Sequence, residues 1–142
     1  MALIRDDLAA QIKQELAALK DPVKLVVFSQ ALADPESEQV KRLLEELSAL
    51  DPEHLSVEPL NFVLEKERAE AMGVARTPAV AVLGAKDYGV RFYGTPQGYE
   101  FGTLLDAILD VSSAEHGLAP ETVAALDALE RPVHIQVFST PT

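Results

Sequence analysis

The sequence of 142 residues contains no cysteine. Without cysteine the chain can form neither a disulfide bond nor a thiolate metal site. It also cannot carry out thiol–disulfide exchange by itself, because the attacking group in that reaction is a cysteine thiolate. Any such chemistry must therefore come from another unit or another chain.

Basic residues are also scarce. The chain has 12 lysines and arginines against 23 aspartates and glutamates, and its formal net charge is −11. Nucleic acids and anionic membrane surfaces both bind clustered positive charge, so we expect neither as a partner. No apolar run reaches the length of a membrane span, and residues 1–7 do not have the composition of a secretory signal. We therefore expect a cytoplasmic protein.

Helical and strand patterns alternate along most of the chain. Asp34 before Pro35 marks the start of a helix, because an aspartate N-cap and a proline at the first helical position both favour one. Gly73 is the expected C′ residue of a short helix, and Pro59 points to an edge strand. Apolar periodicity predicts helices over 6–19, 34–50, 65–72, 99–111 and 120–129, and strands over 23–28, 55–62, 78–83, 89–94 and 133–138.

The order of these elements indicates the fold class. After an extra N-terminal helix, the elements up to residue 111 follow the order β-α-β-α-β-β-α. Two βα units that lead into a hairpin and a closing helix give a mixed sheet with helices on both faces. This is the order of a thioredoxin-type fold, so we expect an α/β protein with a thioredoxin-like fold.

Residues 22–29 and 132–139 have similar sequences. Both begin with Pro-Val and a polar residue, and both end with Val-Phe-Ser. This pattern is typical of an internal repeat whose second copy has only begun, so we expect the chain to be part of a longer protein. We divide it into a thioredoxin-like unit at 1–113 and, at 114–142, a linker helix with the first strand of a truncated second unit. An unpaired apolar strand at 133–138 should pair with a sheet edge of its own or of a neighbouring chain, which would allow a homodimer.

Several stretches, some of them in loops, match a known family. They are residues 22–28, 45–50, 87–94, 96–101, 110–112 and 137–142. The chain resembles the N-terminal half of the protein disulfide oxidoreductases of thermophiles, which are glutaredoxin-like proteins with two thioredoxin units in tandem. The resemblance covers essentially the whole chain, and it implies a thioredoxin-like fold in a protein that carries out thiol–disulfide exchange.

Two departures from the family pattern concern its active sites. The Cys-x-x-Cys motif of the first unit would fall on residues 34–37, where Asp34 and Ser37 stand in place of the two cysteines. The motif of the second unit would follow directly after Thr142. The resemblance thus implies a redox-inactive first unit whose partner is a C-terminal unit of the parent chain with the active dithiol. The tandem module of the alkyl hydroperoxide reductase flavoprotein is similar, since its first unit also lacks the cysteines.

Asp34 and Ser37 have a structural explanation. At a helix N-terminus an aspartate accepts hydrogen bonds from free backbone N–H groups, so we expect Asp34 to be the N-cap and Ser37 to be the N3 residue. The alternative is that Asp34 acts as a nucleophile or base, but no histidine or lysine lies near it in the sequence. We therefore assign no catalytic residue to this chain.

The resemblance also gives a role to Thr77 and Pro78. In thioredoxin-type proteins the corresponding proline is cis and lies beside the redox helix, which leaves the backbone of Thr77 free to pair with an extended peptide. The alternative is a proline that merely starts a strand. Peptide binding at this point would suit a second function, that of a free-standing module that binds peptides or unfolded proteins.

No other pattern points to catalysis, a metal or a cofactor. His54, His116 and His134 lack the spacing of metal ligands, and the turn at 94–98 lacks the lysine of a phosphate loop. The acidic run at 65–70 is interpreted as a solvated helix face. We expect neither a metal nor a cofactor, and an enzyme of another class is the least favoured hypothesis.

Overall fold

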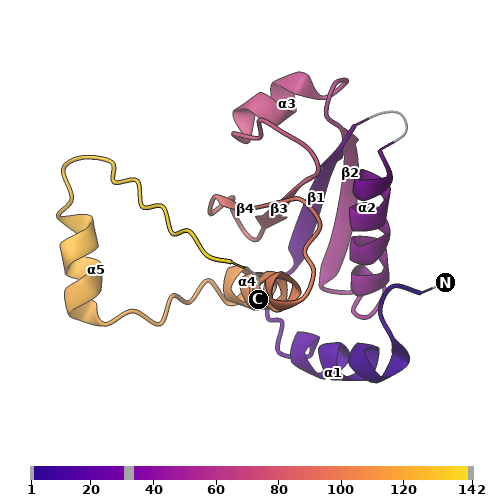
Figure 1. The fold of residues 1–142 in the computed structure, drawn as a ribbon. Coiled ribbons are helices and arrows are strands. Elements are labelled where there is room, and N and C mark those ends of the chain that lie inside the picture. Colours follow the sequence, from indigo (N-terminus) through magenta and orange to yellow (C-terminus); the bar gives the residue numbers. More distant parts are fainter. Residues whose placement is uncertain (1, 31–33, 141–142) are drawn as a thin grey trace.

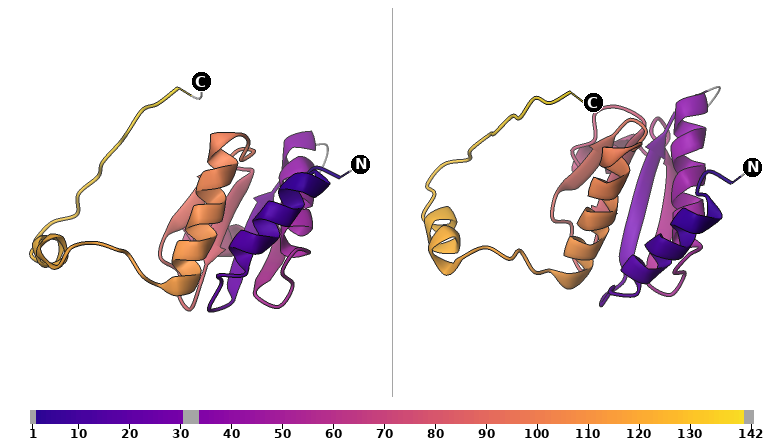
Figure 2. Two further views of the ribbon diagram at one scale, coloured as in Figure 1. Left: turned by 90° about the horizontal axis from the view of Figure 1, so that it is seen from below. Right: turned by 60° about the horizontal axis from the view of Figure 1, so that its bottom comes forward.

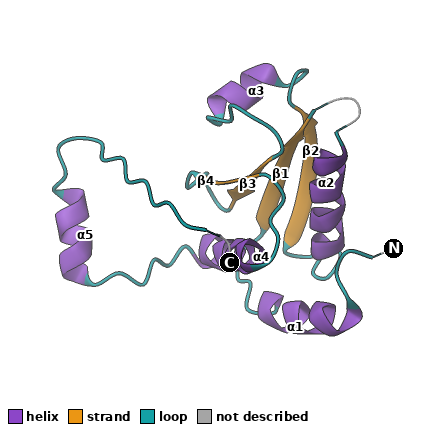
Figure 3. Ribbon diagram, viewed as in Figure 1, coloured by secondary structure: helices purple, strands orange, loops and turns teal. Residues whose placement is uncertain are grey.

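The computed structural model describes residues 2–30 and 34–140 (Figure 1). Figure 3 shows the same ribbon with helices and strands distinguished by colour. Within the described residues the elements are α1 (Asp6–Leu16), β1 (Val23–Ser29), α2 (Pro35–Ser48), β2 (Leu55–Asn61), α3 (Lys66–Ala71), β3 (Ala79–Leu83), β4 (Val90–Tyr93), α4 (Tyr99–Ser113) and α5 (Pro120–Asp127). The predicted order of elements as far as α5 is confirmed. No helix in these ranges has the length and apolarity needed to cross a membrane.

The strands form one sheet in the order β2-β1-β3-β4. β1 runs parallel to β2 and antiparallel to β3, and β3 runs antiparallel to β4. The register places Val27 of β1 opposite Pro59 of β2 on one side and opposite Val80 of β3 on the other. Pro59 therefore lies in an edge strand, as its missing N–H predicts. β1 is central, and its residues 25–28 are fully buried.

Helices cover both faces of the sheet, with α3 on the face opposite to α1, α2 and α4 (Figure 1). Alternate residues of a strand point to opposite faces, and the residues of β1 divide accordingly between two apolar clusters. Leu25 and Val27 pack in the larger cluster with side chains of α1, α2 and α4. Val26 and Phe28 pack in the smaller cluster with Ala69 of α3. The predicted mixed sheet with both faces covered is confirmed.

The ends of two helices show how local hydrogen bonding sets their length. α1 ends at Leu16 and not at the predicted Leu19. The N–H groups of Ala18 and Leu19 donate to carbonyl oxygens three residues before them, at 3.1 and 2.9 Å, which tightens the last turn and ends the α-helix. After α3, Gly73 has a φ of +67°, so the predicted C′ glycine is confirmed.

Residues 114–140 contain α5 but no strand. α5 buries no side chain and ends at Asp127, two residues earlier than predicted. The segment after it is extended and exposed (Figure 2), with Val133 64% and Phe138 90% exposed. The prediction that 133–138 pairs with the chain's own sheet is wrong, because a strand needs a hydrogen-bonded neighbour and the sheet of the described residues holds only β1 to β4. Pairing with another chain stays a prediction.

Candidate functional site

The N-terminus of α2 is capped by a carboxylate. Asp34 is the N-cap residue and Pro35 follows at the first helical position. The backbone N–H of Ser37 donates to Asp34 Oδ1 at 3.3 Å, and the hydroxyl of Ser37 donates to Oδ2. Ser37 is 1% exposed. The predicted cap at Asp34 and the N3 position of Ser37 are both confirmed.

These hydrogen bonds determine the charge of the site. The Ser37 hydroxyl and then the Ser37 backbone N–H hold the pKa of Asp34 below its ordinary value, although partial burial acts in the opposite direction. Asp34 is therefore ionised at neutral pH and has no proton to donate. Both of its oxygens accept hydrogen bonds from the helix that it caps, which suits a structural role.

The Thr77–Pro78 peptide bond is cis, as the family resemblance implied. Ala79 pairs with Phe28 near the end of β1, so Pro78 lies at the end of the central strands from which the chain leads into α2. Pro78 is buried and its carbonyl accepts a hydrogen bond from Gly94 N–H at 3.0 Å. Within residues 2–30 and 34–140, the backbone N–H and C=O of the half-buried Thr77 take no hydrogen bond.

A third segment, the loop after β4, reaches the same helix end. The hydroxyl of Thr95 donates to Glu36 Oε1 at 3.3 Å. Gly94 has a φ of +79°, and a Cβ at this position would stand 3.6 Å from Glu36 Oε1. The N-terminus of α2, the cis-proline turn and residues 94–95 therefore converge. Sequence reasoning found the first two and missed the third, because residues 36 and 95 have no local pattern that pairs them.

Arginine and tyrosine side chains fix the segment that leads into the cis-proline. The guanidinium of Arg91 donates to the Met72 carbonyl at 3.1 and 3.2 Å. The Tyr93 hydroxyl lies 3.5 Å from the Gly73 carbonyl, and Arg76 stacks over the Tyr93 ring at 4.3 Å from its centroid. Arg76 thus places a cation immediately before Thr77 in the chain.

Two of the three histidines take part in local contacts. His54 Nδ1 lies 3.0 Å from a carboxylate oxygen of Asp51, and His116 Nδ1 accepts a hydrogen bond from Leu118 N–H at 3.0 Å. In the part of the chain that the structure describes, no three histidine, aspartate or glutamate side chains are grouped to hold a metal ion. The chemistry available at the site is thus hydrogen bonding and charge.

Comparisons by sequence and by structure point to the same kinds of protein. No protein-family model matches the chain. The alkyl hydroperoxide reductase AhpF from Staphylococcus aureus (strain Mu50) is 30% identical over 141 residues, which are 99% of this chain and 25% of the relative. The same protein from Staphylococcus epidermidis (strain RP62A) is 28% identical over 141 residues, with the same coverage. The chain therefore spans about a quarter of the length of these curated relatives.

Solved structures agree with this relationship. The NTD_N/C domain of the alkyl hydroperoxide reductase AhpF from Enterococcus faecalis superimposes with a TM-score of 0.79 at 26% identity, over 89% of this chain and 61% of that one. A protein disulfide oxidoreductase from Aeropyrum pernix gives a TM-score of 0.79 at 25% identity, over 91% of this chain and 56% of that one. The chain is thus a thioredoxin-like unit related to the N-terminal region of the alkyl hydroperoxide reductase AhpF and to the protein disulfide oxidoreductases, as its sequence resemblance implied.

Proposed function

We propose that this chain is the redox-inactive N-terminal unit of a larger, glutaredoxin-like thiol–disulfide oxidoreductase. The observation that supports this is the pair Asp34 and Ser37 at the N-terminus of α2, beside a cis-proline turn. In a redox-active unit the free N–H groups of such a helix stabilise a cysteine thiolate. Here they stabilise a carboxylate, so the unit keeps the framework of the site without a group that can be oxidised.

The exchange itself then belongs to a second unit. There a thiolate attacks one sulfur of a disulfide, a new S–S bond forms, and the other sulfur leaves as a thiolate. This chain supplies no sulfur for either step. Its part is to support the second unit and to shape the surface on which substrates dock. A cytoplasmic location belongs to the same proposal and is tested by fractionating cells that make the protein.

The exposed tail supports the division into a unit at 1–113 and the start of another at 114–142. In the repeat, the tail residues align with Val23, Leu25, Val27 and Phe28 of β1, which are all at most 1% exposed. Their counterparts are Val133, Ile135, Val137 and Phe138, which are 64 to 90% exposed. Apolar side chains at these positions gain free energy when a sheet covers them, so the tail fits the central strand of a second unit.

The test is to read the coding sequence that follows Thr142 and to assay the longer protein. We expect a Cys-x-x-Cys motif soon after Thr142. We expect the longer protein to reduce the disulfides of insulin, whereas residues 1–142 do not. A continuation without paired cysteines, or insulin reduction that depends on no residue beyond Thr142, would reject the proposal.

A second function, a peptide-binding module, is favoured by the backbone N–H and C=O of Thr77, which take no hydrogen bond from the described residues. An extended peptide can pair with such backbone groups by main-chain hydrogen bonds. The probe is a permanently unfolded protein, carboxymethylated α-lactalbumin, titrated into the ¹⁵N-labelled chain. Binding at this turn shifts the amide resonances of residues 76, 77 and 79 and of residues 34, 36 and 37. Unchanged resonances there would leave only the supporting role.

A further inference from the structure

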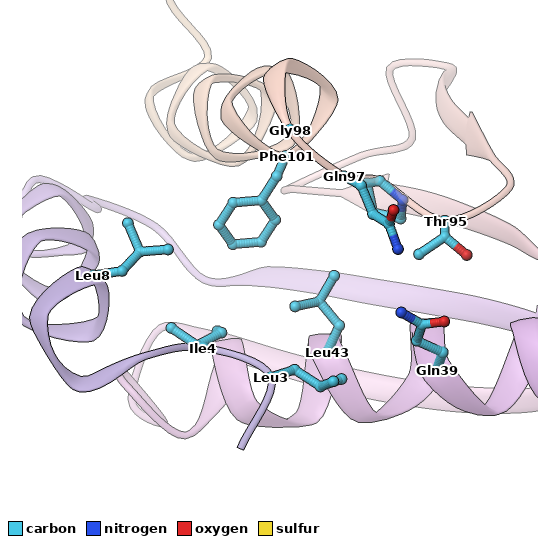
Figure 4. A pocket seen from close by; sticks show the side chains of 10 residues that line it. Leu3, Ile4, Leu8, Gln39, Leu43, Thr95, Gln97, Gly98 and Phe101 are labelled. Atoms are coloured by element: carbon cyan, nitrogen blue, oxygen red, sulfur yellow. The ribbon is translucent and has the colours of Figure 1, made fainter. Parts of the chain in front are cut away.

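The N-terminal ends of α1 and α4 and the middle of α2 meet around one cavity on the face of the sheet that these three helices cover. The cavity has a volume of about 300 Å³ and lies between α1, α2 and the segment that enters α4 (Figure 4). Its lining consists of Leu3, Ile4, Leu8, Gln39, Leu43, Thr95, Pro96, Gln97, Gly98 and Phe101. No residue of the cis-proline turn lines it; it adjoins the site around Thr77 through Thr95, which contacts Glu36.

Specific hydrogen bonds hold two walls of this cavity in place. The backbone N–H groups of Leu3 and Ile4 both donate to Glu46 Oε2 of α2, at 2.7 and 2.9 Å. Across the cavity, the Thr95 hydroxyl donates to Glu36 Oε1 at 3.3 Å. Carboxylates of α2 therefore fix both the segment before α1 and the segment before α4. The space between these segments is part of the folded structure and does not depend on a bound partner.

The cavity has an apolar part and a polar end. Leu8, Leu43 and Phe101 face one another in the apolar part (Figure 4). At the other end the side-chain amides of Gln39 and Gln97 lie near Thr95 (Figure 4), and both glutamines are exposed. A volume of this size is at the lower limit for a ligand pocket and suits one large apolar side chain. Amide groups both donate and accept hydrogen bonds, which matches the peptide backbone beside such a side chain.

The helix turns that border the cavity carry more carboxylates than basic groups, although the exposed Arg42 lies next to Leu43 on α2. The first turns of the three helices carry exposed carboxylates and no basic residue: Asp6 and Asp7 in α1, Glu36 and Glu38 in α2, and Glu100 in α4. Arg5, which precedes α1, is paired with Asp7 at 3.3 Å. This charge distribution attracts cations and repels acidic segments.

We propose that this cavity docks a segment of a partner protein in which one large aliphatic or aromatic side chain lies next to lysine or arginine. The apolar side chain enters between Leu8, Leu43 and Phe101. The two glutamine amides bond to the backbone of the segment, and its cationic neighbours face the carboxylates of the helix N-termini. The inference goes beyond the proposed function, because it assigns a partner to a cavity that the cis-proline turn does not line.

The experiment is a titration of the ¹⁵N-labelled chain with an acetylated and amidated peptide, Lys-Lys-Leu-Lys-Lys. We expect shifted amide resonances to group at Leu3, Gln39, Thr95, Gln97 and Phe101. A peptide with alanine in place of leucine should bind about tenfold more weakly, because it buries less apolar surface. A peptide with glutamate in place of lysine should not bind.

Two variants make the test specific. Gln39→Trp places a large ring at the polar end of the cavity and should abolish binding of the leucine peptide. Gln39 is exposed, so we expect the variant to keep the dispersed amide spectrum of the folded chain. Gln14→Trp makes the same change at an exposed position of α1 that does not line the cavity, and it should bind as the unchanged protein does.

Several results would overturn the inference. Equal affinity for the leucine and alanine peptides would mean attraction by surface charge alone. Shifts grouped at Thr77 would assign the peptide to the cis-proline turn. They would support the peptide-binding function and would reject the cavity as the docking site. Movement of the cavity resonances on raising the protein concentration without peptide would make a second copy the occupant. The absence of any shift at millimolar peptide would also reject the inference.

Discussion

Replacing Asp34 with cysteine would place a single thiol at the N-terminus of α2 in a chain that has no other cysteine. The carboxylate of Asp34 accepts hydrogen bonds from the Ser37 N–H, at 3.3 Å, and from the Ser37 hydroxyl. A thiolate at the same position can accept from the same donors, and the positive end of the helix dipole also favours it. The thiol pKa of Asp34→Cys should therefore lie below its usual value of about 8.5.

The size of the shift follows from opposing contributions. The two donors of Ser37 lower the thiol pKa, whereas the nearby carboxylates of Glu36 and Glu38, in the same helical turn, raise it. We therefore expect a thiol pKa of about 7.5, at the upper end of the range for helix N-termini. The thiolate fraction at pH 7 is then about 25%, against about 3% for an unperturbed thiol. Because nucleophilicity falls with pKa, alkylation at pH 7 should be only about two to three times faster.

The assay follows the ultraviolet absorbance of the thiolate against pH and the rate of alkylation by iodoacetamide at pH 7. Ser56→Cys, at an exposed position of β2, is the control and should have a thiol pKa of about 8.5. Adding Ser37→Ala to Asp34→Cys removes the hydroxyl donor. The thiol pKa should then rise part of the way toward the unperturbed value of about 8.5. A thiol pKa of 8.5 or higher for Asp34→Cys would refute the argument that this helix end retains the framework of a redox site.

Three further changes test how α4 is held against the sheet and how stable the helix itself is. Ser112 is 1% exposed, and its Oγ accepts from two backbone N–H groups in the turn before β1, both at 3.0 Å, and donates to the Asp21 carbonyl at 2.7 Å. Ser112→Ala should lower the free energy of unfolding in urea by about 2 kcal/mol, since solvent can replace part of these hydrogen bonds. An unchanged urea midpoint would contradict this. A Cβ on Gly84 would lie 2.7 Å from Val111 Cγ1 and O, so Gly84→Ala should cost about 1–3 kcal/mol. Gly102→Ala, where a Cβ meets nothing within 4 Å, should instead stabilise α4 by up to about 1 kcal/mol.

The parts of the fold that could be predicted from the sequence depend on contacts between near neighbours in the chain. The cap at Asp34 joins residues three apart, and Gly73 follows directly on the helix that it ends. Apolar periodicity likewise reports which side of each helix or strand is buried, which is enough to order the elements. The cis bond at Pro78 came from family resemblance, because no local pattern distinguishes it from a trans proline that starts a strand.

The contacts that could not be predicted join residues distant in sequence. Glu46 resembles any exposed glutamate of an amphipathic helix, yet it binds the backbone of Leu3 and Ile4, more than forty positions away. Glu36 and Thr95 are 59 positions apart. For the tail at 133–138, the sequence predicts an element that the structure does not contain. Its pattern is that of a strand, but a strand forms only where a neighbour supplies hydrogen bonds, and sequence alone does not say which chain or unit supplies it.

An ion pair between β2 and α3 makes part of the stability of this fold depend on pH. Arg68 donates to both carboxylate oxygens of Glu58, at 2.7 and 2.9 Å, and Lys24 lies 3.5 Å from Oε2. The hydrogen bonds from Arg68, more than any other contact, hold the pKa of Glu58 below its ordinary value. The carboxylate of Glu58 therefore binds a proton more tightly in the unfolded chain than in the folded one. The contribution of Glu58 is complete above the unfolded pKa of about 4.3 and is lost as the pH falls through the lower, folded value.

Glu58→Gln separates this contribution from the rest of the acid response. Both side chains of the pair are about one third exposed (Glu58 30% and Arg68 39%), so solvent weakens the interaction and the variant should lose about 1 kcal/mol at pH 7. At pH 3 the difference from the unchanged protein should be smaller, because Glu58 is then increasingly protonated in both states. Urea unfolding followed by circular dichroism at the two pH values measures the difference in the free energy of unfolding. Glu53→Gln, in the exposed turn before β2, is the control. A loss of the same size at pH 3 and pH 7 would mean that Glu58 acts through packing and not through its charge.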